Sequence, residues 1–146
     1  MSTAIRRILC PVDFSTPSEH AYRYALGLAE TLGAELHLLH AYQLPVYALP
    51  DGAMIPTAEV AIAVSTEAQR SLDAMEATPN VVVHRHLTEG VPHKEVERVV
   101  EELEIDLVVM GTHGRTGIRR LLVGSVAERV VRTCTVPVIT VPPPDR

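Results

Sequence analysis

At 146 residues the chain is long enough for one domain, which would bury about two-thirds of the surface that its unfolded form exposes. Its composition is 47% hydrophobic but only 3% aromatic, so the core must be built from Val, Leu, Ile and Ala, as in parallel sheets covered by helices. A net charge of -5 argues against a nucleic-acid partner, because such binding depends on cationic groups that neutralise phosphates.

Targeting signals and cysteine motifs are missing from the sequence. Residues 1–7 lack the apolar stretch of a secretory signal, and no later segment approaches the roughly 20 apolar residues that cross a bilayer. We therefore expect a cytoplasmic protein with no membrane partner.

Cys10 and Cys134 lie far apart and outside any CxxC motif, which argues against a disulfide framework or a cysteine-based zinc site. No shift in composition divides the chain, so residues 1–146 are expected to form one domain.

The chain begins with an apolar run and a helix that has clear start and stop signals. Residues 7–13 predict a buried strand. Thr16 is the expected N-cap of the following helix, with Pro17 in its first turn and Glu19 completing a capping box. Gly33 fits the left-handed residue that commonly ends a helix.

The rest of the chain repeats this alternation of strand and helix. A second strand is expected over 35–41, and the proline-rich residues 43–56 are expected to form one long loop. Further helices are predicted over 57–78, from Pro92 to about Leu103 and from Ser125 to about Thr133, and further strands over 81–87, 105–110 and 136–141. Ser125 and Glu128 form a second capping-box pattern. Strict alternation predicts an α/β fold, a single doubly wound parallel sheet of five strands with helices on both faces.

The segment between the fourth strand and the fourth helix is rich in glycine. It starts Gly111-Thr112-His113-Gly114-Arg115-Thr116-Gly117 and ends in Gly124-Ser125. Glycine lets backbone N–H groups approach phosphate oxygens, and the start of the next helix adds unpaired N–H groups at the same place. Between Asp106 and Glu128 there is no acidic residue, while Arg115, Arg119 and Arg120 are basic. These features predict a site for an anionic ligand, with a solvated surface loop as the alternative.

The spacing of these glycines resembles that of a known family. Gly111, two residues, Gly114, nine residues and Gly124-Ser125 match the G-x2-G-x9-G-S/T pattern of ATP-binding universal stress proteins. The run Pro11-Val12-Asp13-Phe14-Ser15, the tyrosines and alanines of the first helix, and Pro137-Val138 also resemble that family. The resemblance implies an adenine nucleotide alpha hydrolase-like fold with sheet order 3-2-1-4-5. ATP would then lie at the carboxyl ends of the first and fourth strands, where open α/β sheets bind ligands.

Carried over to this chain, the resemblance implies a set of ATP-binding residues. Asp13 would contact the ribose or the adenine edge, and Pro11, Val12, Ala41 and Met110 would surround the adenine. Gly111, His113, Gly114 and Arg115 would lie along the ribose and phosphates, and Gly124, Ser125 and Val126 would hold the phosphates from the helix start. The ligand is ATP, with or without Mg²⁺. Asp13 and Ser125 also suit local capping roles, which are compatible with ligand contact.

The leading hypothesis for function is a regulatory, stress-response module that binds ATP. A homodimer is expected through 136–141, an apolar strand that the implied sheet order places at an edge, and an unknown protein partner is compatible with it. The sequence has no P-loop, dinucleotide fingerprint, nucleophile elbow or paired-carboxylate motif, which disfavours an efficient hydrolase or kinase. The alternatives are a slow ATPase or related adenylate-handling enzyme using His113 or Asp13, and a nucleotide-free interaction module using residues 43–56.

Two histidines elsewhere in the chain raise the question of a metal. His84 and His86 alternate on a predicted strand and so face the same side, where His37 or His40 could join them. The sequence identifies no third ligand, and histidines in such positions are usually polar residues at sheet ends. No metal site is therefore predicted.

Overall fold

The computed structural model describes residues 4–45, 47–54, 57–112 and 124–144. Its centre is a parallel sheet of five strands in the order β5-β2-β1-β6-β7. The bounds of these strands are Arg7–Pro11 for β1, Glu35–Tyr42 for β2, Val83–Glu89 for β5, Leu107–Gly111 for β6 and Val138–Val141 for β7. Counted along the chain, this is the predicted order 3-2-1-4-5, and β7 lies at one edge.

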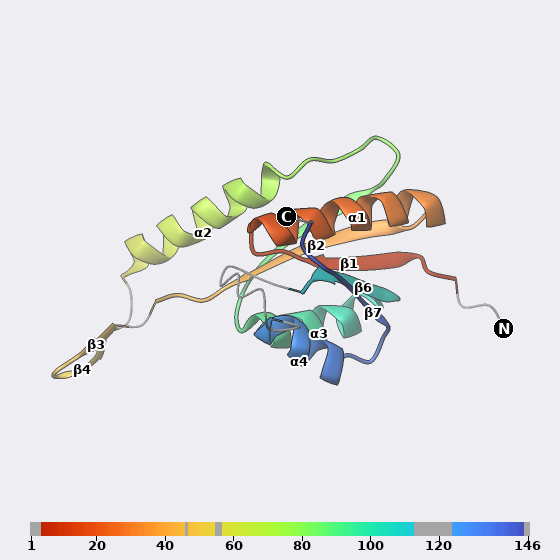
Figure 1. Ribbon diagram of the computed structural model, residues 1–146. Coiled ribbons are helices and arrows are strands. Elements are labelled where there is room, and N and C mark those ends of the chain that lie inside the picture. Colours follow the sequence, from red (N-terminus) through yellow and green to blue (C-terminus); the bar gives the residue numbers. More distant parts are fainter. Residues whose placement is uncertain (1–3, 46, 55–56, 113–123, 145–146) are drawn as a thin grey trace.

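Helices cover both faces of the sheet (Figure 1). α1 (Thr16–Leu32) and α2 (Ala58–Asp73) pack on one face, and α3 (Pro92–Glu102) and α4 (Ser125–Thr133) pack on the other. Ile8 and Cys10 of β1 join the first core and Leu9 joins the second, because alternate residues of a strand point to opposite faces. A strand covered on both sides is apolar throughout, so the predicted doubly wound α/β fold is confirmed. None of the described helices has the length and apolar character needed to cross a bilayer.

The first helix begins one residue earlier than its capping-box pattern predicted. Ser15, and not Thr16, is the N-cap of α1, since its Oγ accepts a hydrogen bond from the Ser18 N–H at 3.3 Å. Ser15 is itself held by Asp13, whose Oδ1 accepts hydrogen bonds from the Ser15 N–H and hydroxyl. Thr16 is the first helical residue and is exposed. The predicted end of this helix is confirmed, with Gly33 in the left-handed conformation at φ 66°.

Residues 43–56 contain more structure than the predicted loop. β3 (Tyr47–Leu49) and β4 (Gly52–Met54) form an antiparallel hairpin, which extends away from the main sheet in Figure 1. Gly52 has φ 133°, a backbone conformation that side chains disfavour, and it follows the two residues of the turn. Strands of three residues among prolines give no periodic pattern long enough to be recognised, which explains why the prediction was wrong here.

Other element ends differ from the predictions for local reasons. α2 ends at Asp73 and not near residue 78, with Ala74 as its C-cap. The Arg85 guanidinium then donates hydrogen bonds to the carbonyls of Leu72 and Met75 at 3.1 and 2.7 Å, which satisfies backbone groups at this helix end. β7 begins at Val138 and not at residue 136, since Pro137 has no N–H for the ladder.

The position of the cap can be tested by removing each hydroxyl in turn. We expect Ser15→Ala to lower the free energy of unfolding by about 1 kcal/mol, because it removes the N-cap hydrogen bond. Thr16→Ala removes only an exposed hydroxyl and should change stability by less than about 0.5 kcal/mol. Equilibrium unfolding in urea measures both. A larger loss for Thr16→Ala than for Ser15→Ala would place the cap at Thr16.

Candidate functional site

A cavity of about 280 Å³ lies at the carboxyl ends of β1 and β6. The strand order reverses between these two strands, since β2 and β5 continue the sheet on one side and β7 on the other. In open α/β sheets this switch point is where ligands bind. The volume is close to the lower end of the range for ligand pockets, about 300 to 1,000 Å³.

Nine of the twelve predicted ATP-binding residues line this cavity. They are Pro11, Val12, Asp13, Ala41, Met110, Gly111, Gly124, Ser125 and Val126. They come from the ends of β1, β2 and β6 and from the start of α4. The remaining three, His113, Gly114 and Arg115, lie outside the described residues. The fold thus gathers four segments that are distant in sequence around one space.

The cavity also has lining residues that the sequence analysis did not assign to the site. They are Ser18, Leu39, Pro92, Val96, Thr112 and Ala127. Leu39 and Val96 are each 1% exposed and belong to the core between the sheet and the helices α3 and α4. Together with the buried Val12 and Met110, they make much of the cavity wall apolar. Leu39 and Thr112 each lie two residues from a predicted strand end, and this position was the signal available in the sequence. Val96 could be found only by knowing where α3 packs.

Asp13 lies in a sharp turn between β1 and α1. Its carboxylate accepts the hydrogen bonds from Ser15, and its own N–H donates to Ser18 Oγ at 3.0 Å. Phe14 adopts φ 65°, an uncommon conformation for a residue with a side chain. Asp13 therefore has the turn-organising role considered from sequence, and it lines the cavity as well.

His40 holds this turn from the neighbouring strand. Its Nδ1 lies 2.8 Å from the Val12 carbonyl oxygen, and its ring packs on Phe14 with centroids 4.3 Å apart. A carbonyl oxygen only accepts, so the proton sits on Nδ1 of His40. His40 is 8% exposed. It acts as a positioning residue for the cavity wall, and its long-range partner gave no signal in the sequence.

The glycines of the motif meet at the cavity although they are distant in sequence. The Gly124 N–H donates a hydrogen bond to the Thr112 carbonyl, and the Thr112 N–H donates to the Val141 carbonyl at 3.2 Å. These bonds fix the end of β6 beside the start of α4. Gly111 and Gly124 therefore border the same space.

α4 begins at the cavity without a side-chain cap. Gly124, and not the predicted Ser125, is its N-cap, because the helix starts at Ser125. Among the described residues no side chain accepts a hydrogen bond at this cap. The first N–H groups of a helix carry partial positive charge and bind anions readily. The cavity thus combines an apolar wall with a helix start suited to an anion.

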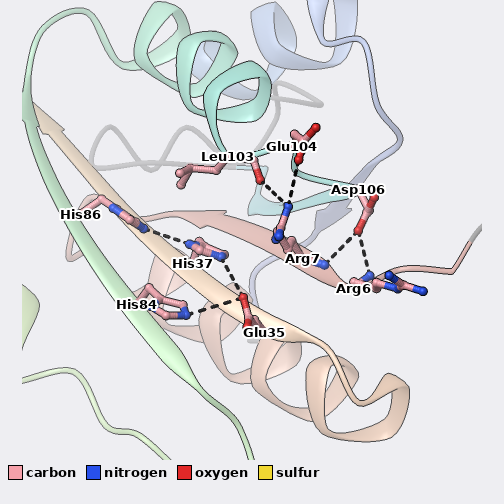
Figure 2. Close-up of polar contacts among 9 residues, drawn as sticks. All are labelled: Arg6, Arg7, Glu35, His37, His84, His86, Leu103, Glu104 and Asp106. Carbon is pink, nitrogen blue, oxygen red and sulfur yellow. Dashed lines mark hydrogen bonds and ion pairs between the residues drawn. The ribbon is translucent and has the colours of Figure 1, made fainter.

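A second polar cluster lies at the amino ends of β2 and β5, on the sheet face that α3 and α4 cover (Figure 2). His37 and His84 are register partners, and Nδ1 of His37 lies 2.9 Å from Nε2 of His86. Oε2 of Glu35 lies 3.6 Å from Nε2 of both His37 and His84. His37 thus stands alongside His84 and His86, as the sequence analysis considered, and Glu35 adds a group that it missed.

The protonation of these histidines follows from their burial. Burial lowers the pKa of His37 to about 4, assisted by the neighbouring His84 and His86 and opposed by Glu35. Burial and His84 also lower the pKa of His86. At neutral pH the His37 ring is therefore uncharged.

Known proteins similar to this chain share one family description. Residues 4–142 match the sequence profile of the Universal stress protein family. The universal stress protein MJ0531 of Methanocaldococcus jannaschii is 34% identical over 143 residues, which cover 97% of this chain and 84% of that protein.

Solved structures have the same architecture. The structure of protein MJ0577, also from Methanocaldococcus jannaschii, has a TM-score of 0.78 and 23% identity, covering 99% of this chain and 100% of that one, which shows the shared fold. A universal stress protein in complex with cAMP has a TM-score of 0.62 and 25% identity, with coverage of 95% and 98%.

The lowered pKa of His37 links stability to pH. An unfolded histidine has a pKa of about 6.5, whereas the pKa of folded His37 is about 4. Between these values the unfolded chain binds more protons, so the contribution of His37 is complete above about pH 6.5 and is lost as the pH falls towards about 4. The slope from this one group is at most about 1.4 kcal/mol per pH unit.

We therefore expect His37→Phe to make the free energy of unfolding less dependent on pH in this window. Urea unfolding of wild type and variant at about pH 7 and about pH 5 gives the two slopes. His20→Phe, on α1, is the matched control and should keep the wild-type slope. Equal slopes for the wild type and His37→Phe would contradict a neutral buried His37.

Proposed function

The chain belongs to the universal stress protein family, and we propose that it is a regulatory module that binds ATP in the cavity at the carboxyl ends of β1 and β6. One observation carries this proposal: the cavity joins an apolar wall to the start of α4, where no side chain of the described residues caps the helix. The hydrogen bond between Gly124 and Thr112 holds the two segments that border the cavity together. A nucleotide presents the matching pair of features, an apolar aromatic base and charged phosphates.

The base would occupy the apolar part of the cavity. Val12, Ala41 and Met110 line it, and Val12 and Met110 are 6% and 5% exposed. Asp13 lies at the end of β1, where its carboxylate can accept hydrogen bonds from ribose hydroxyls or the adenine amino group. A universal stress protein of similar structure in complex with cAMP supports an adenine nucleotide as the ligand. The proposal therefore favours adenine over guanine.

The phosphates would lie at the start of α4. Gly124, Ser125 and Val126 line the cavity there, and the Ser125 hydroxyl adds a donor beside the N–H groups. In the proposal His113, Gly114 and Arg115, which lie outside the described residues, complete this part of the site. Mg²⁺ would be bound through the phosphates, since it prefers oxygen ligands.

We further propose that the protein works as a cytoplasmic homodimer joined through β7. This strand lies at the sheet edge and pairs on one side with β6. The run Val138-Ile139-Thr140-Val141 has no charge, and an apolar edge strand invites pairing with another chain. Antiparallel pairing about a two-fold axis closes on itself without forming fibres. Because the Val141 carbonyl of β7 also accepts a hydrogen bond from the Thr112 N–H, the dimer would couple to the cavity.

The phosphate site can be tested at Gly124. This residue has φ -65° and ψ 161°, a backbone conformation that any residue adopts. A side chain at this position would therefore leave the backbone unstrained and would occupy space that the proposal gives to the phosphates. We expect Gly124→Val to weaken ATP binding at least tenfold, about 1.4 kcal/mol. Isothermal titration calorimetry, with and without Mg²⁺, measures the affinity.

Gly27→Val is the matched control, because a Cβ at Gly27 on α1 meets nothing within 4 Å. It should bind ATP as the wild type does. Unchanged affinity in Gly124→Val, with the fold intact by circular dichroism, would remove the phosphate assignment. Equal displacement of ATP by GTP would leave the phosphate site in place but remove the adenine preference.

The dimer can be tested by disulfide cross-linking. Cys134 is replaced by Ser, whereas Cys10 stays, because burial raises the pKa of its thiol to about 12 and leaves it unreactive. Single cysteines are then placed in turn at positions 138 to 141. Residues next to the two-fold axis have Cα atoms closer than about 7 Å, so at least one variant should cross-link on mild oxidation. No cross-link at any position, together with a monomer in sedimentation, would disprove the dimer.

A further inference from the structure

We propose that Glu35, His37 and His84 form a binding site for a divalent transition-metal cation, with Zn²⁺ as its simplest occupant. The site lies at the amino ends of β2 and β5, whereas the nucleotide cavity lies at the carboxyl ends of the strands. Along β2, His37 and Ala41 are about 13 Å apart at the usual rise per residue. The proposal is therefore independent of the proposed function.

The three ligand atoms are already close to the geometry that Zn²⁺ requires. Oε2 of Glu35, Nε2 of His37 and Nε2 of His84 all lie within 4.8 Å of one another, and two of the separations are 3.6 Å. Bonds of about 2.0 to 2.2 Å in a tetrahedral site place ligand atoms about 3.4 Å apart. The side chains of His84 and Glu35 are 42% and 48% exposed, so both can move by the small remaining amount.

His37 supplies the strongest reason for a ligand. The residue is 6% exposed, and its Nε2 is buried without a hydrogen-bond partner. The 3.6 Å separation from Glu35 is too long for a hydrogen bond. A buried polar atom left unpaired costs about 1 to 3 kcal/mol. A cation held between Nε2 and the carboxylate would satisfy both groups.

The second nitrogen of His37 has the partner that metal-binding histidines usually have. With its proton on Nδ1, His37 donates to Nε2 of His86 across 2.9 Å, and its own Nε2 then carries a lone pair and lies 3.6 Å from Oε2 of Glu35. Metal-ligating histidines commonly donate their other N–H to such an acceptor, which fixes the tautomer. The lowered pKa of His37 favours the neutral ring that a cation needs. His86 is thus a positioning residue for the metal ligand.

The sheet sets the spacing of the two imidazoles. His37 and His84 are register partners on adjacent strands, and their rings stack with centroids 4.6 Å apart. β5 is the edge strand, held to the sheet through β2. A metal bound to both side chains would therefore tie the edge strand to its neighbour. A site on strands is held more firmly than one on loops.

The neighbouring positive charge is directed elsewhere. Arg7 is the register partner of Glu35 on β1, yet its guanidinium donates to the Leu103 carbonyl at 3.2 Å and pairs with Glu104 at 3.4 Å (Figure 2). Arg85, between the two β5 histidines, donates to the backbone carbonyls of Leu72 and Met75 at the end of α2. The cluster thus presents a carboxylate and imidazole nitrogens, with no arginine paired to the carboxylate among the contacts of Arg7 and Arg85. Imidazole nitrogens select zinc, copper, nickel or iron over Mg²⁺ and Ca²⁺, which prefer oxygen.

The test is calorimetric titration of Zn²⁺ into wild-type protein that carries no polyhistidine tag and has been treated with a chelator. We expect one Zn²⁺ to bind per cluster, and Glu35→Gln and His84→Gln each to weaken binding at least tenfold. Both residues are substantially exposed, so the fold should survive, as circular dichroism would show. His20→Gln, which replaces a histidine on α1, is the matched control and should bind like the wild type.

A second readout separates this site from the nucleotide cavity. Co²⁺ in place of Zn²⁺ should give visible absorption bands that His84→Gln removes, and Gly124→Val should leave Zn²⁺ binding unchanged. A wild-type protein that binds no Zn²⁺ would overturn the proposal. Glu35→Gln and His84→Gln variants that bind Zn²⁺ as tightly as the wild type would overturn it as well. Neither result would bear on ATP binding.

Discussion

The helices that follow β1 and β6 pack on opposite faces of the sheet, and the candidate site depends on this divergence. β1 leads into α1 on one face and β6 leads on to α4 on the other, although the two strands are hydrogen-bonded neighbours. A space therefore opens between the starts of α1 and α4, just beyond the carboxyl ends of the strands. Buried core residues that border the cavity form its apolar wall, and the start of α4 forms its polar wall. The cavity is thus a consequence of topology, and local bonds such as that between His40 and the Val12 carbonyl only give it a definite shape.

The two ends of the same sheet offer different chemistry. At the carboxyl ends, backbone N–H groups at a helix start provide donors, which suits a phosphate. At the amino ends, side chains from paired strands provide acceptors, which suits a cation, and the register of β2 with β5 places His37 beside His84. The proposed anion site and the proposed cation site can therefore occupy a small domain without competing for the same groups.

Much of the fold could be predicted from the sequence, because the information is local. Alternating apolar runs and helices, Gly33 at a helix end and the glycine spacing from Gly111 to Gly124 are all readable within short windows. Ser15 was missed as a cap because adjacent Ser15 and Thr16 both have suitable hydroxyls, and only the bonds to Asp13 and Ser18 decide between them. The partnership of Glu35 with His84 depends on strand register, which the sequence alone leaves open.

The central claim is that the cavity between β1 and β6 holds an adenine nucleotide. The most direct test is to titrate isotope-labelled protein with ATP and to measure the NMR chemical shifts of the backbone amides. Each residue other than proline has its own amide signal, so the shifts locate the bound nucleotide residue by residue. The account predicts shifts concentrated at Val12, Asp13, Met110 and the start of α4, with the amides around His37 and His84 unchanged. Saturable shifts confined to another surface, or none at the cavity with ATP in large excess, would contradict it.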